Sequence, residues 1–416
     1  MKRILIVTLM FSFSMISYFD RTIMSIAGPG MIRDFGISPT AMGSIYSAFI
    51  LGYGLLMIPG GLFTDKVGPR RTLTLMGFGS ALFTALVIFG PALGVFIGIV
   101  PALFAIRFGL GVVTAPLYPA CARVTAEWIP VALHGRVQGI VIAGSSFGAA
   151  ISPFLFTWIA ARFKWWAPFL FAALVTTALA MWWRRSARDY PATAEARVAH
   201  SWGTLFRNRN LLLITYAYAT LGYFQYIFFY WIYYYFGQIL RLGQDVSARY
   251  MAILFLTEGA VMPLGGFVSD RLTARYGPQL GRRLVPIAGL SLGSLLTYIA
   301  TASVGARVVV CFALAFGLAA CCEGPFWAAV TEMAGEQVGG ASSILNTGAQ
   351  LGGFWAPMLT PFIAGRAGWS WGLYAGCFIA LSGVVAVCFV RLHAIENDGN
   401  VDGRVVGQRS TANSVL

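Results

Sequence analysis

The chain has 416 residues, of which 58% are hydrophobic and only 11% are charged. Soluble domains carry roughly a quarter charged residues, so this inventory cannot build a water-exposed surface, and lipid must be the solvent for most of the chain. The formal net charge is +14. The basic residues fall in short patches between apolar stretches, which is how membrane proteins fix their orientation. Binding to nucleic acid is therefore not expected.

Twelve apolar stretches follow one another along the chain, each long enough to cross a bilayer, since a span needs about 20 apolar residues. The first begins directly after a basic start, like a signal peptide. It continues past Asp20 without a small-residue cleavage pattern, so we expect it to be retained. The predicted spans are 4–28, 41–63, 72–92, 94–122, 137–161, 165–185, 210–236, 247–268, 284–303, 306–328, 341–364 and 369–391.

The longest polar interval divides these spans into six and six. The fold class is predicted as an all-α integral membrane protein with two six-helix bundles. Placing both termini in the cytoplasm puts most of the 29 Lys and Arg residues on the cytoplasmic side. The predicted organisation is an N-terminal bundle (1–185), a cytoplasmic linker (186–209), a C-terminal bundle (210–391) and a disordered cytoplasmic tail (392–416).

The two halves carry the same short pattern at the same place. After the second predicted span, Gly61 is followed four residues later by Asp65 and then by a base. After the eighth, Gly266 is followed four residues later by Asp270 and then by a base. This is the parallel repeat expected of two bundles related by an axis along the membrane normal.

The loop 61–71 resembles the signature of the major facilitator superfamily, and the resemblance extends over roughly residues 5–392. It implies two bundles that rock around a central site. An acid at a helix end beside cations could latch the bundles together on the cytoplasmic side and release them during transport. The alternative is that the loop arginines only enforce topology. The predicted gating residues are Asp65, Arg70, Arg71 and Asp270.

Several motifs resemble the anion:cation symporter branch of this superfamily, which carries organic anions such as sugar acids. They are Tyr18-Phe19-Asp20-Arg21 in the first span, Tyr53 before Pro59 in the second, Arg107 in the fourth and Asn346-Thr347-Gly348 in the eleventh. In many proton-coupled members a glutamate follows seven residues after the equivalent of Arg107. This chain has Thr114 there, so the usual two-acid arrangement is incomplete.

Ionisable groups in mid-span cost about 2.5–3.5 kcal/mol each on insertion scales, so each needs a partner or a function. Arg21 and Arg107 supply two permanent positive charges whose planar forks match a carboxylate. We expect them to bind an anionic substrate. Asp20 is the predicted proton carrier, because a substrate that neutralises the arginine would let the acid take up a proton. The alternative is a permanent Asp20–arginine pair that only holds helices together.

Glu323 lies in the tenth span, before a Gly324-Pro325 pair that can break the helix. It is predicted as a second protonation or cation site, or else as a satisfied structural glutamate. Glu258 in the eighth span is predicted as a structural or gate-pairing group. The other predicted substrate contacts are polar or amphipathic side chains: Tyr18, Tyr53, Gln225, Trp327 and Asn346. Most aromatic residues of the seventh span are expected to be interface anchors.

The leading functional hypothesis is a secondary transporter that moves a small organic anion by alternating access, with protons as the coupling ion. A uniporter, exchanger or exporter remains open, and a solute sensor is a remote alternative. No nucleotide-binding loop, metal constellation or nucleophile–base pair occurs in the sequence, so neither an enzyme nor a cofactor is expected. We expect a monomer in a bacterial inner membrane. The identity of the anion is left open.

Overall fold

The computed structural model describes residues 2–129, 134–188, 202–334 and 338–392, and these residues form helices with no strand among them. The first half contains α1 (Lys2–Phe35), α2 (Pro39–Val67), α3 (Pro69–Leu86), α4 (Gly90–Ile97), α5 (Ile99–Thr114), α6 (Leu117–Trp128), α7 (His134–Arg162) and α8 (Ala167–Ser186). The second half contains α9 (Trp202–Arg207), α10 (Arg209–Tyr234), α11 (Gln244–Tyr276), α12 (Pro278–Thr301), α13 (Ala306–Ala320), α14 (Glu323–Ala334), α15 (Val338–Ala367) and α16 (Trp369–Phe389).

Eleven helices or collinear helix pairs of the described chain are long and apolar enough to cross a bilayer. The pairs α3–α4, α5–α6 and α13–α14 each act as one span. The predicted span 341–364 coincides with α15, a helix of 30 residues that falls outside this apolar set. The all-helical membrane fold is therefore confirmed, whereas the count of twelve spans stays a prediction.

The outer surface is apolar, as a lipid-facing surface requires. Large hydrophobic side chains such as Val95 and Phe96 are 82% and 85% exposed. Serines and threonines along the helices return their hydroxyl hydrogens to main-chain carbonyls one turn back, for example Thr176 to Ala172 at 2.7 Å. Hydroxyl groups bonded in this way are satisfied inside their own helix, which lipid demands.

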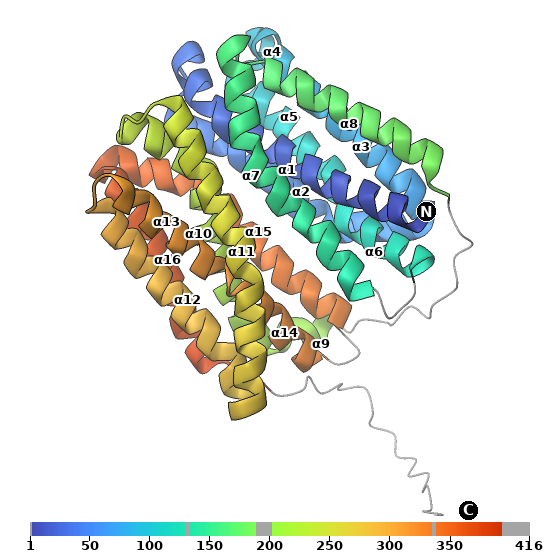
Figure 1. The fold of residues 1–416 in the computed structure, drawn as a ribbon, viewed down its shortest axis with the longest axis vertical. Helices are drawn as coiled ribbons and strands as arrows, with labels where there is room; N and C mark the ends of the chain where they lie inside the picture. Colours follow the sequence, from blue (N-terminus) through green and yellow to red (C-terminus); the bar gives the residue numbers. More distant parts are fainter. Residues whose placement is uncertain (1, 130–133, 189–201, 335–337, 393–416) are drawn as a thin grey trace, which may run out of the picture.

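The helices form two bundles that lie side by side (Figure 1): the blue-to-green helices α1 to α8 and the yellow-to-red helices α10 to α16. Glycines let the central helices approach closely. A side chain at Gly148 of α7 would strike the Met15 carbonyl of α1, and one at Gly352 of α15 would strike the Ala219 carbonyl of α10. The same kind of contact therefore holds corresponding helix pairs in both bundles.

Contacts between the bundles concentrate in the half of the molecule away from the chain termini. We call the end that carries the start of α1 and the end of α16 the terminal end, and the other end the opposite end. In the opposite half, Tyr46 of α2 stacks on Tyr230 of α10 with ring centroids 4.9 Å apart. The Ser47 hydroxyl donates to the Phe354 carbonyl of α15 at 2.6 Å. A side chain at Gly43 would strike the Pro357 carbonyl.

The fourth and tenth spans are both interrupted near their middle. α5 ends at Thr114 and α6 begins after Ala115 and Pro116, while α13 ends at Ala320 and α14 begins at Glu323. The expected break at Gly324-Pro325 is displaced, because the interruption falls three residues earlier, at Cys321 and Cys322. Pro325 occupies the first turn of α14, where its missing N–H leaves no helix hydrogen bond unmade.

Part of the predicted linker and tail lies outside the described residues, namely 189–201 and 393–416. The short helix α9 (Trp202–Arg207) lies in the described part of the predicted linker, directly before α10. The predicted domain boundaries therefore stay a prediction.

Candidate functional site

Two arginines from different helices of the first bundle lie next to each other, deep in the protein. Arg21 of α1 is 4% exposed and Arg107 of α5 is 1% exposed. Both guanidinium groups contact the Phe49 ring of α2. Its centroid lies 4.7 Å from the Arg21 Cζ and 5.1 Å from the Arg107 Cζ. The arginines predicted from separate spans are thus brought together on one aromatic ring.

The Arg21 guanidinium is surrounded by aromatic faces. Its Cζ lies 4.8 Å from the Tyr18 ring centroid, 4.7 Å from that of Phe49 and 4.6 Å from that of Tyr53. Each contact is a cation–π interaction, which partly offsets the loss of water around the charge. The arrangement orders the guanidinium without neutralising it.

Both arginines retain hydrogen-bond donors that nothing in the described chain uses. The Arg21 Nε and the Arg107 Nε and Nη2 are buried and have no hydrogen-bond partner there. No carboxylate of the described residues lies within 4.0 Å of either guanidinium. Buried charged donors without acceptors are expensive, so the chemistry of this pair suits an anion.

Asp20 holds Arg107 through its main chain, not through its carboxylate. The Arg107 Nη1 donates to the Asp20 carbonyl at 2.9 Å, and Asp20 Oδ1 is buried without a hydrogen-bond partner among the residues that the structure describes. The alternative of a permanent Asp20–arginine ion pair is therefore not what the structure shows. Asp20 points toward Thr84 of α3, away from the aromatic cluster around Arg21.

Thr114 occupies the position at which many proton-coupled members of the branch have a glutamate. Its hydroxyl donates to the Leu110 carbonyl at 2.7 Å and lies 3.2 Å from the Ser80 hydroxyl of α3. These contacts satisfy the group locally, and Thr114 cannot take up a proton. The first bundle therefore has one carboxylate at this depth, that of Asp20.

The second bundle contributes tyrosines and carboxylates on the facing side. Tyr18 of α1 packs edge-on against Phe229 of α10 at 6.0 Å. Tyr226 of α10 interacts electrostatically with both Arg21 and Glu323, and Tyr18 with both Arg21 and Glu258. We call Arg21 and Arg107 the arginine wall of the first bundle. This wall and the two acids of the second bundle, Glu258 and Glu323, thus face one another across the bundle interface.

Glu323 is held by a short chain of hydrogen bonds. The Tyr218 hydroxyl donates to the Glu323 Oε2, and the Trp327 Nε1 donates to the Tyr218 hydroxyl at 2.9 Å. Gln225, one of the predicted substrate contacts, also lies beside this carboxylate. Glu323, Gln225 and Trp327 therefore form one polar group on the wall of the second bundle.

Asn346 lies apart from both polar walls. Its Nδ2 lies 3.1 Å from the Met57 sulfur at the contact between α2 and α15. A sulfur is a weak acceptor, so the amide keeps hydrogen-bonding capacity. Asn346 remains a predicted substrate contact that the geometry does not bring to the arginines.

The four predicted gating residues lie at the terminal end. Asp65 and Arg71 are exposed, and Arg70 donates to the Arg184 carbonyl of its own bundle at 2.7 Å. Asp270 pairs with Arg282 at 2.6 Å, and Arg282 also pairs with Glu332 at 2.7 Å. Among the described residues, these contacts stay within one bundle.

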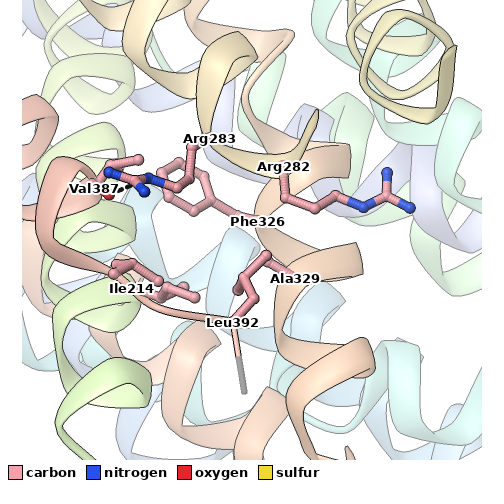
Figure 2. A pocket seen from close by; sticks show the side chains of 8 residues that line it. Ile214, Arg282, Arg283, Phe326, Ala329, Val387 and Leu392 are labelled. Atoms are coloured by element: carbon pink, nitrogen blue, oxygen red, sulfur yellow. Dashed lines mark hydrogen bonds between the residues drawn. The ribbon is translucent and has the colours of Figure 1, made fainter. Parts of the chain in front are cut away.

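A small pocket lies beside this network in the second bundle (Figure 2). Arg283 reaches the Val387 carbonyl at 3.0 Å, whereas Arg282 points the other way. Arg283 is thus used to tie α12 to α16, and the rest of the lining is mostly apolar. This pocket offers no substrate site.

Some residues of the candidate site were missed in the sequence. Phe49 and Tyr218 are aromatic side chains in apolar surroundings, where packing is the default expectation. A usable signal was spacing, because Phe49 lies one helical turn before Tyr53 and Tyr218 two turns before Gln225, so each shares a face with a predicted contact. No group of three or more metal-ligating side chains gathers among the residues searched.

Comparison with known proteins identifies the family. Residues 10–357 match the model of the Major Facilitator Superfamily. The probable sulfoacetate transporter SauU of Cupriavidus necator is 27% identical over 85% of each chain. The hexuronate transporter of Bacillus subtilis is 26% identical, covering 93% of this chain and 94% of its own.

Solved structures show the same fold. A bacterial homologue of the human lysosomal transporter Spinster, in an inward-facing and occupied conformation, has a TM-score of 0.80 at 14% identity, covering 93% of this chain and 96% of its own. The expected class, a transporter and not an enzyme, is confirmed by the family and by the names of the relatives. The chain belongs to the Major Facilitator Superfamily.

Proposed function

We propose that this transporter carries a small organic anion, with a carboxylate bound between Arg21 and Arg107, across a bacterial inner membrane by alternating access. The observation that carries the proposal is the pair of buried guanidinium groups whose donors lack acceptors in the described chain. Relatives named for sulfoacetate, hexuronate and galactarate or D-glucarate transport support an anionic solute.

The arrangement of contacts supports a conformation open toward the terminal end. The aromatic stack of Tyr46 on Tyr230 and the close approach of Gly43 to Pro357 join the bundles at the opposite end. The gating pairs at the terminal end stay within one bundle. With both termini in the cytoplasm, as the distribution of basic residues favours, this conformation faces inward.

Asp20 is the proposed proton carrier of the first bundle. Its carboxylate is 3% exposed and has no ion partner within 4.0 Å in the described residues. An uncompensated carboxylate at this depth is costly, so binding of a proton is favoured when the bundle closes around substrate. Anion and proton would then cross together.

Exchange without proton coupling is the second candidate function. The observation that favours it is Thr114, whose neutral hydroxyl stands where a second acid would be needed and is satisfied by Leu110 and Ser80. An exchanger would import one anion for each anion that it exports, and the pH gradient would not change this exchange. Accumulation driven by a pH gradient separates the two candidates.

Counterflow in proteoliposomes tests the proposal. Purified protein is reconstituted with unlabelled D-glucuronate, D-galactonate, galactarate or sulfoacetate inside, and uptake of the same labelled anion is followed. We expect at least one anion to exchange, and Arg21→Ala and Arg107→Ala to abolish that exchange. Arg162→Ala, the same substitution at an exposed arginine that stacks on Trp158 at 4.3 Å, is the matched control. Normal exchange by both site variants would contradict the anion site.

A further inference from the structure

Two carboxylates of the second bundle lie at the depth of the anion site, and neither has a cationic partner. Glu258 of α11 and Glu323 of α14 interact with each other electrostatically. No lysine, arginine or histidine of the described residues lies within 4.0 Å of either one. Neighbouring carboxylates in a low-dielectric site cannot both stay ionised at low cost, so binding of a proton by one of them is favoured.

An internal repeat singles out Glu323. The segment 114–118 reads Thr-Ala-Pro-Leu-Tyr and the segment 323–327 reads Glu-Gly-Pro-Phe-Trp, so a small residue, a proline, an apolar residue and an aromatic follow in the same order. Both segments lie at the interruption of the fourth span of their half. In this alignment Glu323 corresponds to Thr114, although Thr114 ends α5 before the interruption and Glu323 begins α14 after it.

The hydrogen bonds around Thr114 and Glu323 differ, and only those around Glu323 leave an atom that can bind and release a proton. The Thr114 hydroxyl is satisfied by the Leu110 carbonyl and the Ser80 hydroxyl. At Glu323, the Tyr218 hydroxyl donates to the Glu323 Oε2 and accepts from the Trp327 N–H. The Glu323 Oε2 is thus an acceptor, which leaves the Glu323 Oε1 as the atom that gains and loses a proton.

Tyrosines connect this carboxylate to the arginine wall. Tyr226 interacts electrostatically with both Arg21 and Glu323, and it stacks on Tyr230 with ring centroids 5.8 Å apart. The polar or titratable groups that face Glu323 are Tyr218, Gln225 and Tyr226 from α10, Glu258 from α11 and Cys322 ahead of α14. None of them carries a positive charge. Any influence of the Arg21 charge on this acid passes through Tyr226, which interacts with both groups, and a bound anion would cancel that charge.

We propose that Glu323 carries a coupling proton of the transport cycle, in the second bundle, at the place where the repeat of the first bundle has the neutral Thr114. When an anion neutralises Arg21, the Glu323 Oε1 takes a proton from water on the open side, and it returns that proton to water on the other side after the anion leaves. Only an O–H bond forms and breaks. This inference rests on the proposed anion transport and adds the residue that couples it.

Accumulation against a gradient measures the protons carried per anion. Proteoliposomes containing the full chain are held at zero membrane potential with a potassium ionophore, and a gradient of about one pH unit is imposed. Each coupled proton adds about a tenfold accumulation ratio per pH unit, since one unit corresponds to 1.36 kcal/mol. The probe is the labelled anion, D-glucuronate for example, that shows counterflow with the wild-type protein.

Glu323→Gln should lower the accumulation ratio about tenfold and leave counterflow at wild-type rate, because exchange needs no net proton movement. Asp34→Asn is the matched control, because it neutralises an exposed carboxylate that pairs with Arg33 at 3.0 Å outside the site, and it should accumulate as the wild type does. The counterflow measurement also shows that the Glu323→Gln protein is folded.

Three outcomes would overturn the inference. An unchanged ratio in Glu323→Gln, or a wild type that exchanges the anion but never accumulates it, refutes proton coupling through Glu323 while leaving anion transport intact. A wild type without counterflow of any of the four anions refutes the proposed function and the inference with it.

Discussion

Replacing Arg21 by alanine separates a binding role from a structural one, because the two roles predict opposite effects on stability and binding. In the empty protein the guanidinium has three aromatic rings within 4.8 Å and no carboxylate within 4.0 Å in the described chain. A cation–π contact is worth about 1 kcal/mol in a partly wet site, so three contribute about 3 kcal/mol. The cost of a charge in mid-span is about 2.5–3.5 kcal/mol.

These two terms nearly cancel, so Arg21→Ala should hardly change the stability of the empty protein. A net change below about 1 kcal/mol corresponds to a shift in melting temperature of at most about 4 °C. Binding should change far more. An anion that loses one partner of a buried charge pair loses about 3–5 kcal/mol of binding free energy. This loss raises the dissociation constant on the order of 10²- to 10⁴-fold.

The assay measures melting temperature and the dissociation constant of the exchanged anion on the same detergent-purified sample. Arg21→Lys is the informative companion, because it keeps the charge but loses the planar fork, and its binding should fall between those of the wild type and Arg21→Ala. The reasoning is refuted if Arg21→Ala melts more than 10 °C lower, as a lost structural pair would require, while it binds the anion with unchanged affinity.

Three further predictions concern coupling and closure. Asp20→Asn should keep counterflow but lose about tenfold in accumulation per pH unit; equal accumulation would assign the proton elsewhere. Gly43→Val should strike the Pro357 carbonyl, and because overpacking costs about 1–3 kcal/mol, the exchange rate should fall roughly 5- to 150-fold with an unchanged dissociation constant. A rate equal to the wild type would show that this contact does not form in the cycle. Asp65→Asn should slow exchange by up to about fivefold, the worth of an exposed ion pair, and an unaffected rate would remove Asp65 from the gate.

The membrane fold followed from composition and from the lengths of the apolar runs, because lipid permits few alternatives to helices. The arginines could also be recognised, since a charge in an apolar run stands out on its own. Their shared ring could not be predicted. Phe49 is one apolar residue among many, and only the packing of α1, α2 and α5 places it between Arg21 and Arg107.

Side-chain direction explains the remaining differences. The adjacent residues Asp20 and Arg21 suggested either a pair or a division of labour, and neither spacing nor charge decides which carbonyl an arginine reaches. Arg107 reaches the Asp20 carbonyl from another helix. The role of Asp270 was equally undetermined, because its partner Arg282 lies in the next helix of the same bundle, and the sequence does not state which conformation the bundles adopt.

An experimental structure with the exchanged anion bound tests the central claim most directly. Carboxylate oxygens should lie about 2.7–2.9 Å from guanidinium nitrogens of both Arg21 and Arg107, the usual length of a charge-assisted hydrogen bond. An anion found elsewhere, with both guanidinium groups still facing only aromatic rings and the Asp20 carbonyl, would contradict the claim.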